Sequence, residues 1–453
     1  MKNKIIVILL CILLIIVAIP VSSNTELLIN RESNAIKENS LEGGWTEERD
    51  GVTIIHLNGS NYEMGYQHGF LLKDEIKENM RMITSFFERR GYPYGVVLEI
   101  WDMMKGFLPQ EYKDEMQGMA DGLGVSFEEV AIYNTWPAVV NYIFVSCCGA
   151  AVWGSATVDN KLYHMRSLDI LHPGLDIKDP DTETFFRENQ VLIVRKPDNS
   201  YASIYPVSAG AVYSWGGVNE KGIAISANTC VTYDSTFLGI SAAFRMRMAL
   251  DYANNTDEVI KIINSNRTCG WNFIISDGKI PIGYVIEQTA NLVYFGTWFH
   301  PVESKDPFWE IENVVRRTPM FISPTCAATE PQRKHYDPSG LRGFLLFLMK
   351  KNLYFTVWSK YKALSKEFEN QWETLDLNST MTLLRDVYLG KTDFLFFILQ
   401  KSKSSCYKAL HQWVACPETG DLVISFSDDN ANTACENPVH YFNMFELLEA
   451  EPP

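Results

Sequence analysis

Several patterns that carry chemistry are missing from this chain of 453 residues. It has no Cys-x-x-Cys pair and no His-Glu-x-x-His segment, which argues against a zinc site. Basic residues form no run beyond short pairs such as Lys350-Lys351, and the formal net charge is -15. Because an acidic surface of this kind repels phosphate backbones, we expect no nucleic-acid partner.

Internal repeats and low-complexity segments are also missing, and the composition is that of an ordinary globular protein. Hydrophobic residues make up 46% of the chain, aromatic residues 13% and charged residues 21%. These proportions exclude a disordered, collagen-like or mostly coiled-coil chain. The length fits roughly two to four domains, or one large enzyme core.

Only the N-terminus carries an apolar run that approaches the length of a membrane span. Lys2 and Lys4 precede the apolar run Ile5–Ala18, and the small residues Ser22-Ser23 follow it. This pattern predicts a signal peptide over residues 1–23 that is removed on export. The alternative is a retained membrane anchor. We therefore expect a secreted protein, or one in an extracytoplasmic or lysosome-like compartment, that is membrane-anchored if this segment is retained.

Export would permit disulfides and glycosylation. Of the nine cysteines, Cys11 lies inside the apolar run, and the pairing of the others cannot be read from the sequence. A glycoprotein is expected where the source organism glycosylates exported proteins. The Asn-x-Ser/Thr sequons are Asn58, Asn254, Asn266 and Asn378.

The predicted secondary structure changes at Cys147, from mainly helical to a mixture of strands and helices. Residues 51–57 read as a strand, but helical spacing over 70–87 and 95–145 makes the segment 24–146 mainly helical. After residue 147 short apolar runs predict a mixed sheet with helices, and hence an α+β fold with layered sheets. Strands are expected at 149–153, 162–166, 191–195, 202–206, 211–215, 222–227, 272–275, 284–286, 291–295, 412–415 and 422–426, and helices at 242–253, 256–263 and within 340–400.

A hairpin beginning at Cys147 is the most informative stretch. Asp159-Asn160 is a good hairpin turn because both residues tolerate a positive φ. The start of the first strand then lies beside the end of the second, which carries Arg166 and Asp169. A guanidinium beside the Cys147 thiol would favour the reactive thiolate.

A nucleophilic cysteine also needs a base. His164 is near in sequence and shares strand parity with Arg166, so pairing with the thiol is not excluded. Alternatively, cleavage just before the cysteine would free an α-amine, whose unperturbed pKa of roughly 7.7–8.0 suits proton transfer near neutrality. The alternatives are purely structural roles. Cys147 and Cys148 would be core residues or halves of disulfides, and Arg166 and Asp169 would form a surface ion pair.

This hairpin resembles that of the N-terminal-nucleophile cysteine hydrolases. The nearest resemblance is to the acyl-CoA:6-aminopenicillanic acid acyltransferase family of autoproteolytic amidases, and choloylglycine hydrolases and acid ceramidase-like amidases are more distant. The family pattern is Cys, a small residue, a hairpin with an Asp-Gly turn, then Arg-Asn-x-Asp. Here Asn160 replaces the usual Gly and Ser167 the usual Asn.

Other motifs extend the resemblance over roughly residues 50–450. Tyr62–Gly69 is similar to a Tyr-Glu-x-Gly-x-x-x-Gly motif of the family prosegment, and Val218–Asn228 to a strand that ends in an oxyanion-binding Asn. Asp337–Arg342 is similar to a helix start whose Arg supports the site. The family often has an Asn after Arg-Thr, but here Pro319 follows. That departure puts one polar contact in doubt.

The resemblance implies a four-layer αββα N-terminal-nucleophile hydrolase sandwich. Residues 24–146 would be a mainly helical prosegment, or α chain, and residues 147–453 the hydrolase core, or β chain. Cleavage before the nucleophile would leave these two chains able to associate. No metal and no organic cofactor is implied. The implied catalytic residues are Cys147, Arg166, Asp169, Asn228 and Arg342, with Cys148 as the alternative nucleophile.

Three functions remain open at this point. The first is an exported, self-processing cysteine amidase that hydrolyses a small-molecule N-acyl amide, or transfers its acyl group, through a thioester. The second is a lipid amidase or phospholipase B-like hydrolase at a membrane surface. The third, kept open by Pro319, is an inactive binding protein on the same scaffold. Asn228 would then merely end a strand, and Arg342 would be solvated.

Overall fold

The computed structural model describes residues 40–140, 147–171, 177–331, 354–391, 407–428 and 433–452, together with residue 345. The expected signal peptide, Ser146, Arg342 and Cys406 lie outside the described residues. Residues from Asn39 onward form one compact unit. None of the helices that the structure describes combines the length and the apolar character needed to span a bilayer.

The larger of two sheets contains ten strands within the described ranges. Neighbouring strands run antiparallel, except that β3 and β6 are parallel. In spatial order the strands are β1 (Ser40–Leu41), β2 (Gly44–Arg49), β3 (Val52–Gly59), β6 (Gln190–Pro197), β7 (Ser203–Ser208), β8 (Gly216–Asn219), β9 (Ile223–Thr229), β10 (Trp271–Asp277), β11 (Ile282–Gln288) and β12 (Val293–Gly296).

The smaller sheet has six described strands, all antiparallel, and holds the hairpin that begins at Cys147. In spatial order they are β13 (Val314–Arg317), β4 (Cys148–Gly154), β5 (Asn160–Leu171), β14 (Tyr407–Cys416), β15 (Asp421–Phe426) and β16 (His440–Asn443).

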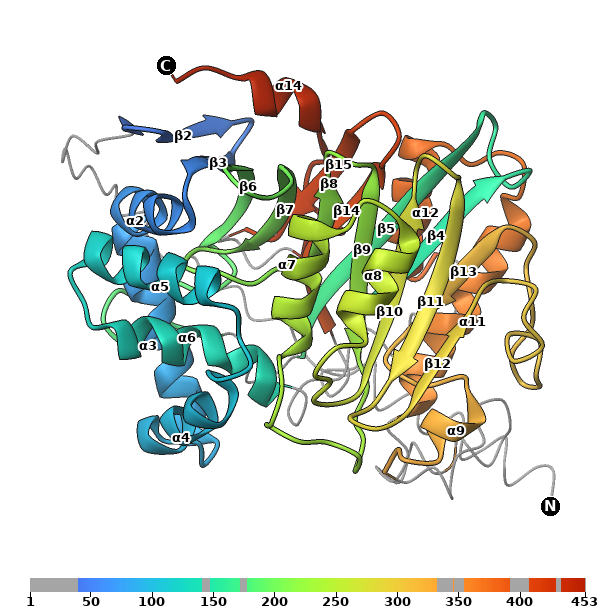
Figure 1. The fold of residues 1–453 in the computed structure, drawn as a ribbon. Helices are drawn as coiled ribbons and strands as arrows, with labels where there is room; N and C mark the ends of the chain where they lie inside the picture. Colours follow the sequence, from blue (N-terminus) through green and yellow to red (C-terminus); the bar gives the residue numbers. More distant parts are fainter. Residues whose placement is uncertain are drawn as a thin grey trace, which may run out of the picture. The chain divides into compact units, whose positions relative to one another are not determined.

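The helices pack on the faces of the sheets that point away from each other. Helices α7 (Ala242–Tyr252) and α8 (Thr256–Ile263) cover the larger sheet, and α11 (Tyr354–Asn370) and α12 (Leu377–Tyr388) cover the smaller one (Figure 1). Two short helices are α9 (Pro324–Ala327) and α14 (Met444–Glu449).

Alternation along the strands reveals the order of these layers. On β9, Ile225 lies in a core with α7 and α8, whereas Ala224 lies in a core with Trp413 of the smaller sheet. On β4, Ala150 lies in a core with α11 and α12, whereas Ala151 packs with Ile274 of the larger sheet. The order is therefore helices, larger sheet, smaller sheet, helices.

Five helices of the described residues 40–140 precede the hairpin and gather near β2, β3 and β6 of the larger sheet, coloured blue to teal in Figure 1. Of these, α2 and α5 approach very closely. A Cβ added at Gly65 of α2 would lie 1.9 Å from the Glu115 carbonyl oxygen, and one at Gly118 of α5 would lie 2.0 Å from the Tyr62 carbonyl oxygen. The helices are α2 (Asn61–Leu71), α3 (Lys73–Arg89), α4 (Tyr94–Met104), α5 (Gln110–Leu123) and α6 (Phe127–Val140).

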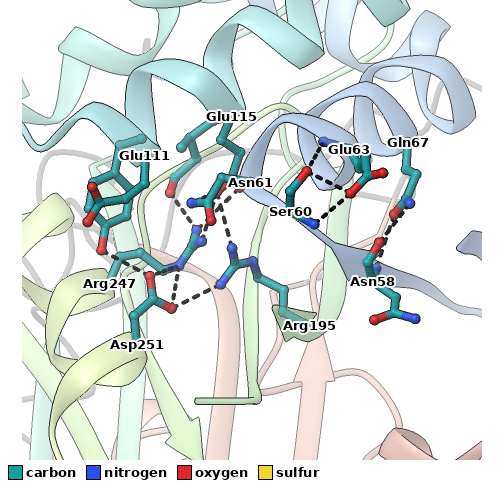
Figure 2. Close-up of polar contacts among 12 residues, drawn as sticks. Asn58, Ser60, Asn61, Glu63, Gln67, Glu111, Glu115, Arg195, Arg247 and Asp251 are labelled. Atoms are coloured by element: carbon teal, nitrogen blue, oxygen red, sulfur yellow. Dashed lines mark hydrogen bonds and ion pairs between the residues drawn. The ribbon is translucent and has the colours of Figure 1, made fainter. Parts of the chain in front are cut away.

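A buried ion-pair cluster joins these helices to the rest of the unit. Glu115 Oε2 of α5 accepts from Arg195 of β6 at 3.1 Å and from Arg247 of α7 at 2.9 Å (Figure 2). Asp251 pairs with both arginines, at 2.9 Å and 3.1 Å. The four side chains are at most 2% exposed, and their formal charges cancel. Residues on the two sides of position 146 are thus tied together inside the protein.

The prediction of an α+β fold with stacked sheets is confirmed, with local corrections. The strand expected at residues 51–57 forms as β3, but the segment before the hairpin also supplies β1 and β2, which were not expected, to the larger sheet. The Tyr62–Gly69 motif is itself helical and lies in α2.

The strand expected at residues 211–215 is wrong. That stretch is apolar and buried, but the Val212 N–H donates to the Asn134 side chain at 2.8 Å rather than to a neighbouring strand. The strand forms one step later, as β8.

Candidate active site

The hairpin register places the predicted residues together. Asn160 takes a positive φ of 60° at the turn, as its side chain tolerates, and Cys148 then faces Ser167 across the hairpin. The main-chain N–H of Cys147, just before β4, donates to Asp169 Oδ2 at 3.1 Å. Cys147, Arg166 and Asp169 line one pocket. All three are buried, so the Arg166/Asp169 pair is not a surface ion pair.

The pocket at Cys147 has a largely apolar wall. One aromatic wall residue, Trp136, comes from α6, before the hairpin. It packs edge-on against Trp215, with the ring centroids 5.4 Å apart. The pocket therefore takes side chains from both sides of position 146. Its remaining lining is Leu168, Ile177, Phe186, Gln190, Ser208, Thr229, Trp271 and Leu410.

Asp169 is held by several donors. Its Oδ2 accepts from Lys360 Nζ and from the Tyr388 hydroxyl, each at 2.6 Å, and its Oδ1 accepts from the Ser167 hydroxyl at 2.6 Å. Burial alone would raise the pKa of the Asp169 carboxyl, but the charge of Lys360 and these hydrogen bonds hold it below its ordinary value. Asp169 is therefore a carboxylate fixed beside the Cys147 nitrogen.

Arg166 brings a buried positive charge to the same pocket. Its Nη1 donates to the Ala227 carbonyl on β9, whereas Nε and Nη2 have no hydrogen-bond partner among the described residues. Burial raises the pKa of the Cys147 thiol, and the Arg166 guanidinium opposes that rise. Two N–H-bearing nitrogens of Arg166 are thus available to a group bound in the pocket.

The two adjacent cysteines have different surroundings. Cys147 lines the pocket, whereas Cys148 lies in the core beneath α11 and α12, with its Sγ 3.4 Å from the Tyr388 hydroxyl. Burial raises the pKa of the Cys148 thiol to about 12. The seven cysteines that the structure describes are all buried.

Asn228 lies at the end of β9, directly before the pocket residue Thr229. Its Nδ2 donates to the Arg317 carbonyl at 3.1 Å, which leaves its second N–H for another acceptor, and its Oδ1 has no partner among the described residues. Asn272 faces it on β10 and donates to the carbonyls of Thr318 and Met320 at 3.0 Å and 2.7 Å. Asn272 therefore fixes the loop that contains Pro319.

His164 does not contact Cys147. Its ring lies between the hydroxyls of Ser276 and Ser226, each at 2.8 Å, and stacks on Trp413. Burial, followed by the charge of Arg166, lowers the pKa of His164 to about 3. This imidazole is a neutral, hydrogen-bonded core residue between the sheets.

Sequence reasoning missed Lys360, Tyr388 and Trp136. Lys360 and Tyr388 lie 191 and 219 residues after Asp169, on helices whose residues gave no local motif. Arg342 falls outside the described residues.

Comparison with known proteins supports the resemblance drawn from the motifs. The model of the family described as acyl-coenzyme A:6-aminopenicillanic acid acyl-transferase matches residues 176–291. The matched segment contains Asn228 and starts after the hairpin. The resemblance to this acyltransferase family is confirmed.

The chain is also similar in sequence to individual proteins of two organisms. It is 26% identical to protein dcd1A of Dictyostelium discoideum over 251 residues, which are 48% of this chain and 54% of that protein. It is 25% identical to an uncharacterized protein of Archaeoglobus fulgidus over 261 residues, 51% of this chain and 42% of that protein. The chain spans about half the length of the relatives it matches.

Among solved structures, a variant of conjugated bile acid hydrolase from Clostridium perfringens is similar, with a TM-score of 0.42 and 15% identity. The alignment covers 67% of this chain and 95% of that one. A Caenorhabditis elegans N-acylethanolamine-hydrolyzing acid amidase ortholog gives a TM-score of 0.32 at 12% identity, over 60% and 93% of the two chains.

Proposed function

We propose that this protein is an exported, self-processing cysteine amidase or acyltransferase built as a four-layer αββα N-terminal-nucleophile hydrolase. Maturation would break the Ser146–Cys147 peptide bond. The Cys147 thiol attacks the Ser146 carbonyl, the nitrogen of Cys147 leaves as an amine, and water hydrolyses the resulting thioester. Residues up to 146 and from 147 onward would then be two chains of one enzyme.

In the mature enzyme the freed α-amine of Cys147 would be the base. It takes the thiol proton while Sγ attacks the substrate carbonyl, and the second N–H of Asn228 stabilises the oxyanion. The leaving amine receives the proton, and water or another amine then resolves the thioester. Arg166 and Asp169 orient the nucleophile, and Arg342 is proposed as a support of the site.

The placement of the Cys147 nitrogen carries this proposal. The atom that would become the α-amine donates to a buried carboxylate, and the same residue lines a pocket with a buried guanidinium. The φ of Cys147 is 107°, a region that costs a residue with a side chain of order 1–3 kcal/mol. Strain next to the bond that breaks favours its cleavage.

The pocket wall favours an apolar acyl group. Tryptophan, phenylalanine and leucine side chains give little reward to a polar chain, so N-acyl amides with an apolar acyl moiety are the proposed substrates. The same wall is the observation that keeps a lipid amidase as the second candidate. A retained N-terminal anchor would place that enzyme at a membrane surface.

Export remains part of the proposal, and its simplest marker is glycosylation. Asn58, Asn254, Asn266 and Asn378 are all exposed, as glycan acceptors must be. A mass decrease on treatment with a glycosidase that removes N-linked glycans, in protein from the native source, would support passage through a secretory compartment.

Intact-mass analysis and N-terminal sequencing test the proposal first. We expect two fragments, the second beginning at Cys147, and a single uncut chain for Cys147→Ala. Cys148→Ala is the matched control, and we expect it to be cut because its thiol lies outside the pocket. An uncut wild-type chain would remove the α-amine base and favour the binding-protein alternative.

A further inference from the structure

We infer that Lys360 is a positioning residue whose ammonium balances the charge of Asp169 beside the Cys147 nitrogen, and so keeps the amine freed by cleavage able to accept a proton. This inference rests on the proposed function. It concerns a residue that no sequence motif indicated.

The contact geometry places both groups on one oxygen. Asp169 Oδ2 accepts from the Cys147 nitrogen at 3.1 Å and from Lys360 Nζ at 2.6 Å. The Lys360 side chain is 1% exposed and the Asp169 side chain 0%. Because little water screens these groups, each charge acts strongly on its neighbours.

A carboxylate alone would be the wrong neighbour for a catalytic amine. Its negative charge would stabilise the ammonium form and hold the proton that the amine must be free to take from the thiol. The ammonium of Lys360 cancels that charge at close range. With Lys360 in place, the charge that remains near the Cys147 nitrogen among the described residues is the guanidinium of Arg166, which favours both a neutral amine and a thiolate.

The titratable groups that the structure describes around this pair leave the balance intact. From α12, the Tyr388 hydroxyl donates to Asp169, and its pKa lies well above the ordinary value because of burial and of Asp169. From β14, burial and then Arg166 hold the pKa of His411 well below its ordinary value. Both stay neutral across the working range. The thiols that also face this cluster are Cys148 on β4 and Cys435 beyond β15, and burial raises the pKa of both.

Packing alone gives no reason for a lysine at position 360. Its neighbours on α11, Tyr361, Ala363 and Leu364, are buried apolar residues in contact with the cores around the smaller sheet. Burying an ammonium among them is costly unless it is paired. Within the described part of the chain it pairs with Asp169 and, at 3.1 Å, with the Tyr388 hydroxyl.

The test compares Lys360→Met with Lys360→Arg, which keeps the charge, and with Lys366→Met, which removes an exposed lysine from the same helix. The readout is the pH dependence of Cys147 alkylation by iodoacetamide in the cleaved protein, located by peptide mass spectrometry. We expect the midpoint to move toward higher pH by about one unit or more in Lys360→Met. Lys360→Arg and Lys366→Met should stay near the wild-type midpoint.

A cleaved, folded Lys360→Met protein with the wild-type midpoint would overturn the inference while leaving the proposed function standing. An uncut wild-type chain would sink the proposed function itself. If Lys360→Met does not fold, titration of the α-amine in the wild-type protein tests the inference instead. Acetic anhydride labelling against pH then titrates the Cys147 α-amine. A midpoint at or below about 7.7 supports the balance, and one above about 8.5 contradicts it.

Discussion

At the scale of single residues, neighbouring identical side chains meet different chemistry because strand geometry sends them to opposite sides. Cys147 lies on the pocket with Arg166, whereas Cys148 lies under α11 and α12. The same alternation separates Ser226, which holds His164 between the sheets, from Ala227, which faces the helices. The side that a residue takes therefore decides whether it can meet a substrate.

Asn228 and Asn272 provide a matched pair at this scale. They face each other across β9 and β10, and both are buried. We expect Asn228→Ala to lower kcat by about 10²- to 10³-fold with little change in KM, because an oxyanion donor acts in the transition state. Steady-state kinetics on an N-acyl amide substrate would measure this.

Asn272→Ala is the control, since its amide holds main-chain carbonyls at 3.0 Å and 2.7 Å. It should lower the temperature of unfolding and leave the rate of the remaining folded enzyme much less affected. Equal losses of kcat in the two variants would contradict an oxyanion role specific to Asn228.

Which parts of the candidate site can be predicted from the sequence is also clearest for single residues. The Cys147, Arg166 and Asp169 neighbourhood could be predicted because a hairpin fixes register over about twenty positions. Lys360 and Tyr388 could not, because they arrive from helices 191 and 219 residues beyond Asp169 and carry no local pattern. Their place depends on how α11 and α12 pack on the smaller sheet.

At the scale of elements, the Tyr62–Gly69 motif serves packing. His68 Nε2 accepts from the Gly210 N–H at 3.0 Å and anchors α2 to the loop after β7. Gly65 and Gly69 face α5, while Gly118 and Gly122 of α5 face α2. Helices α3 to α6 were predictable from their spacing, whereas α2 was not. The strands β1 and β2 were not predictable either, because two- and six-residue strands give too short an alternation.

The contact between α2 and α5 yields the prediction for this scale. We expect Gly118→Ala to lower the free energy of unfolding by about 1–3 kcal/mol, since its Cβ would meet main-chain atoms of Tyr62 that cannot move alone. Gly95→Ala on α4 is the control, because nothing lies within 4 Å of its Cβ position. Urea unfolding would compare them, and equal stability of the two variants would show that the helices separate at little cost.

At the scale of the whole molecule, the position before Cys147 divides a structure that is continuous in space. β3, which precedes it, pairs in parallel with β6, which follows it. The pocket takes Trp136 from one side and Trp215 from the other. The ion pairs of Glu115 with Arg195 and Arg247 are a third contact between the two sides. Cleavage at this position would cut the chain without removing any of these contacts.

We therefore expect the two cleaved chains to stay together and co-elute on size exclusion at neutral pH, separating only in denaturant. Glu115→Ala would leave Arg195 and Arg247 without one of their buried carboxylate partners, and removing one member of a buried pair costs about 3–5 kcal/mol. Glu111→Ala, on the same helix, loses a partly exposed contact with the Tyr252 hydroxyl and should change little. If the wild-type chains and the Glu115→Ala chains separate at the same denaturant concentration, the buried cluster does not hold the two chains together.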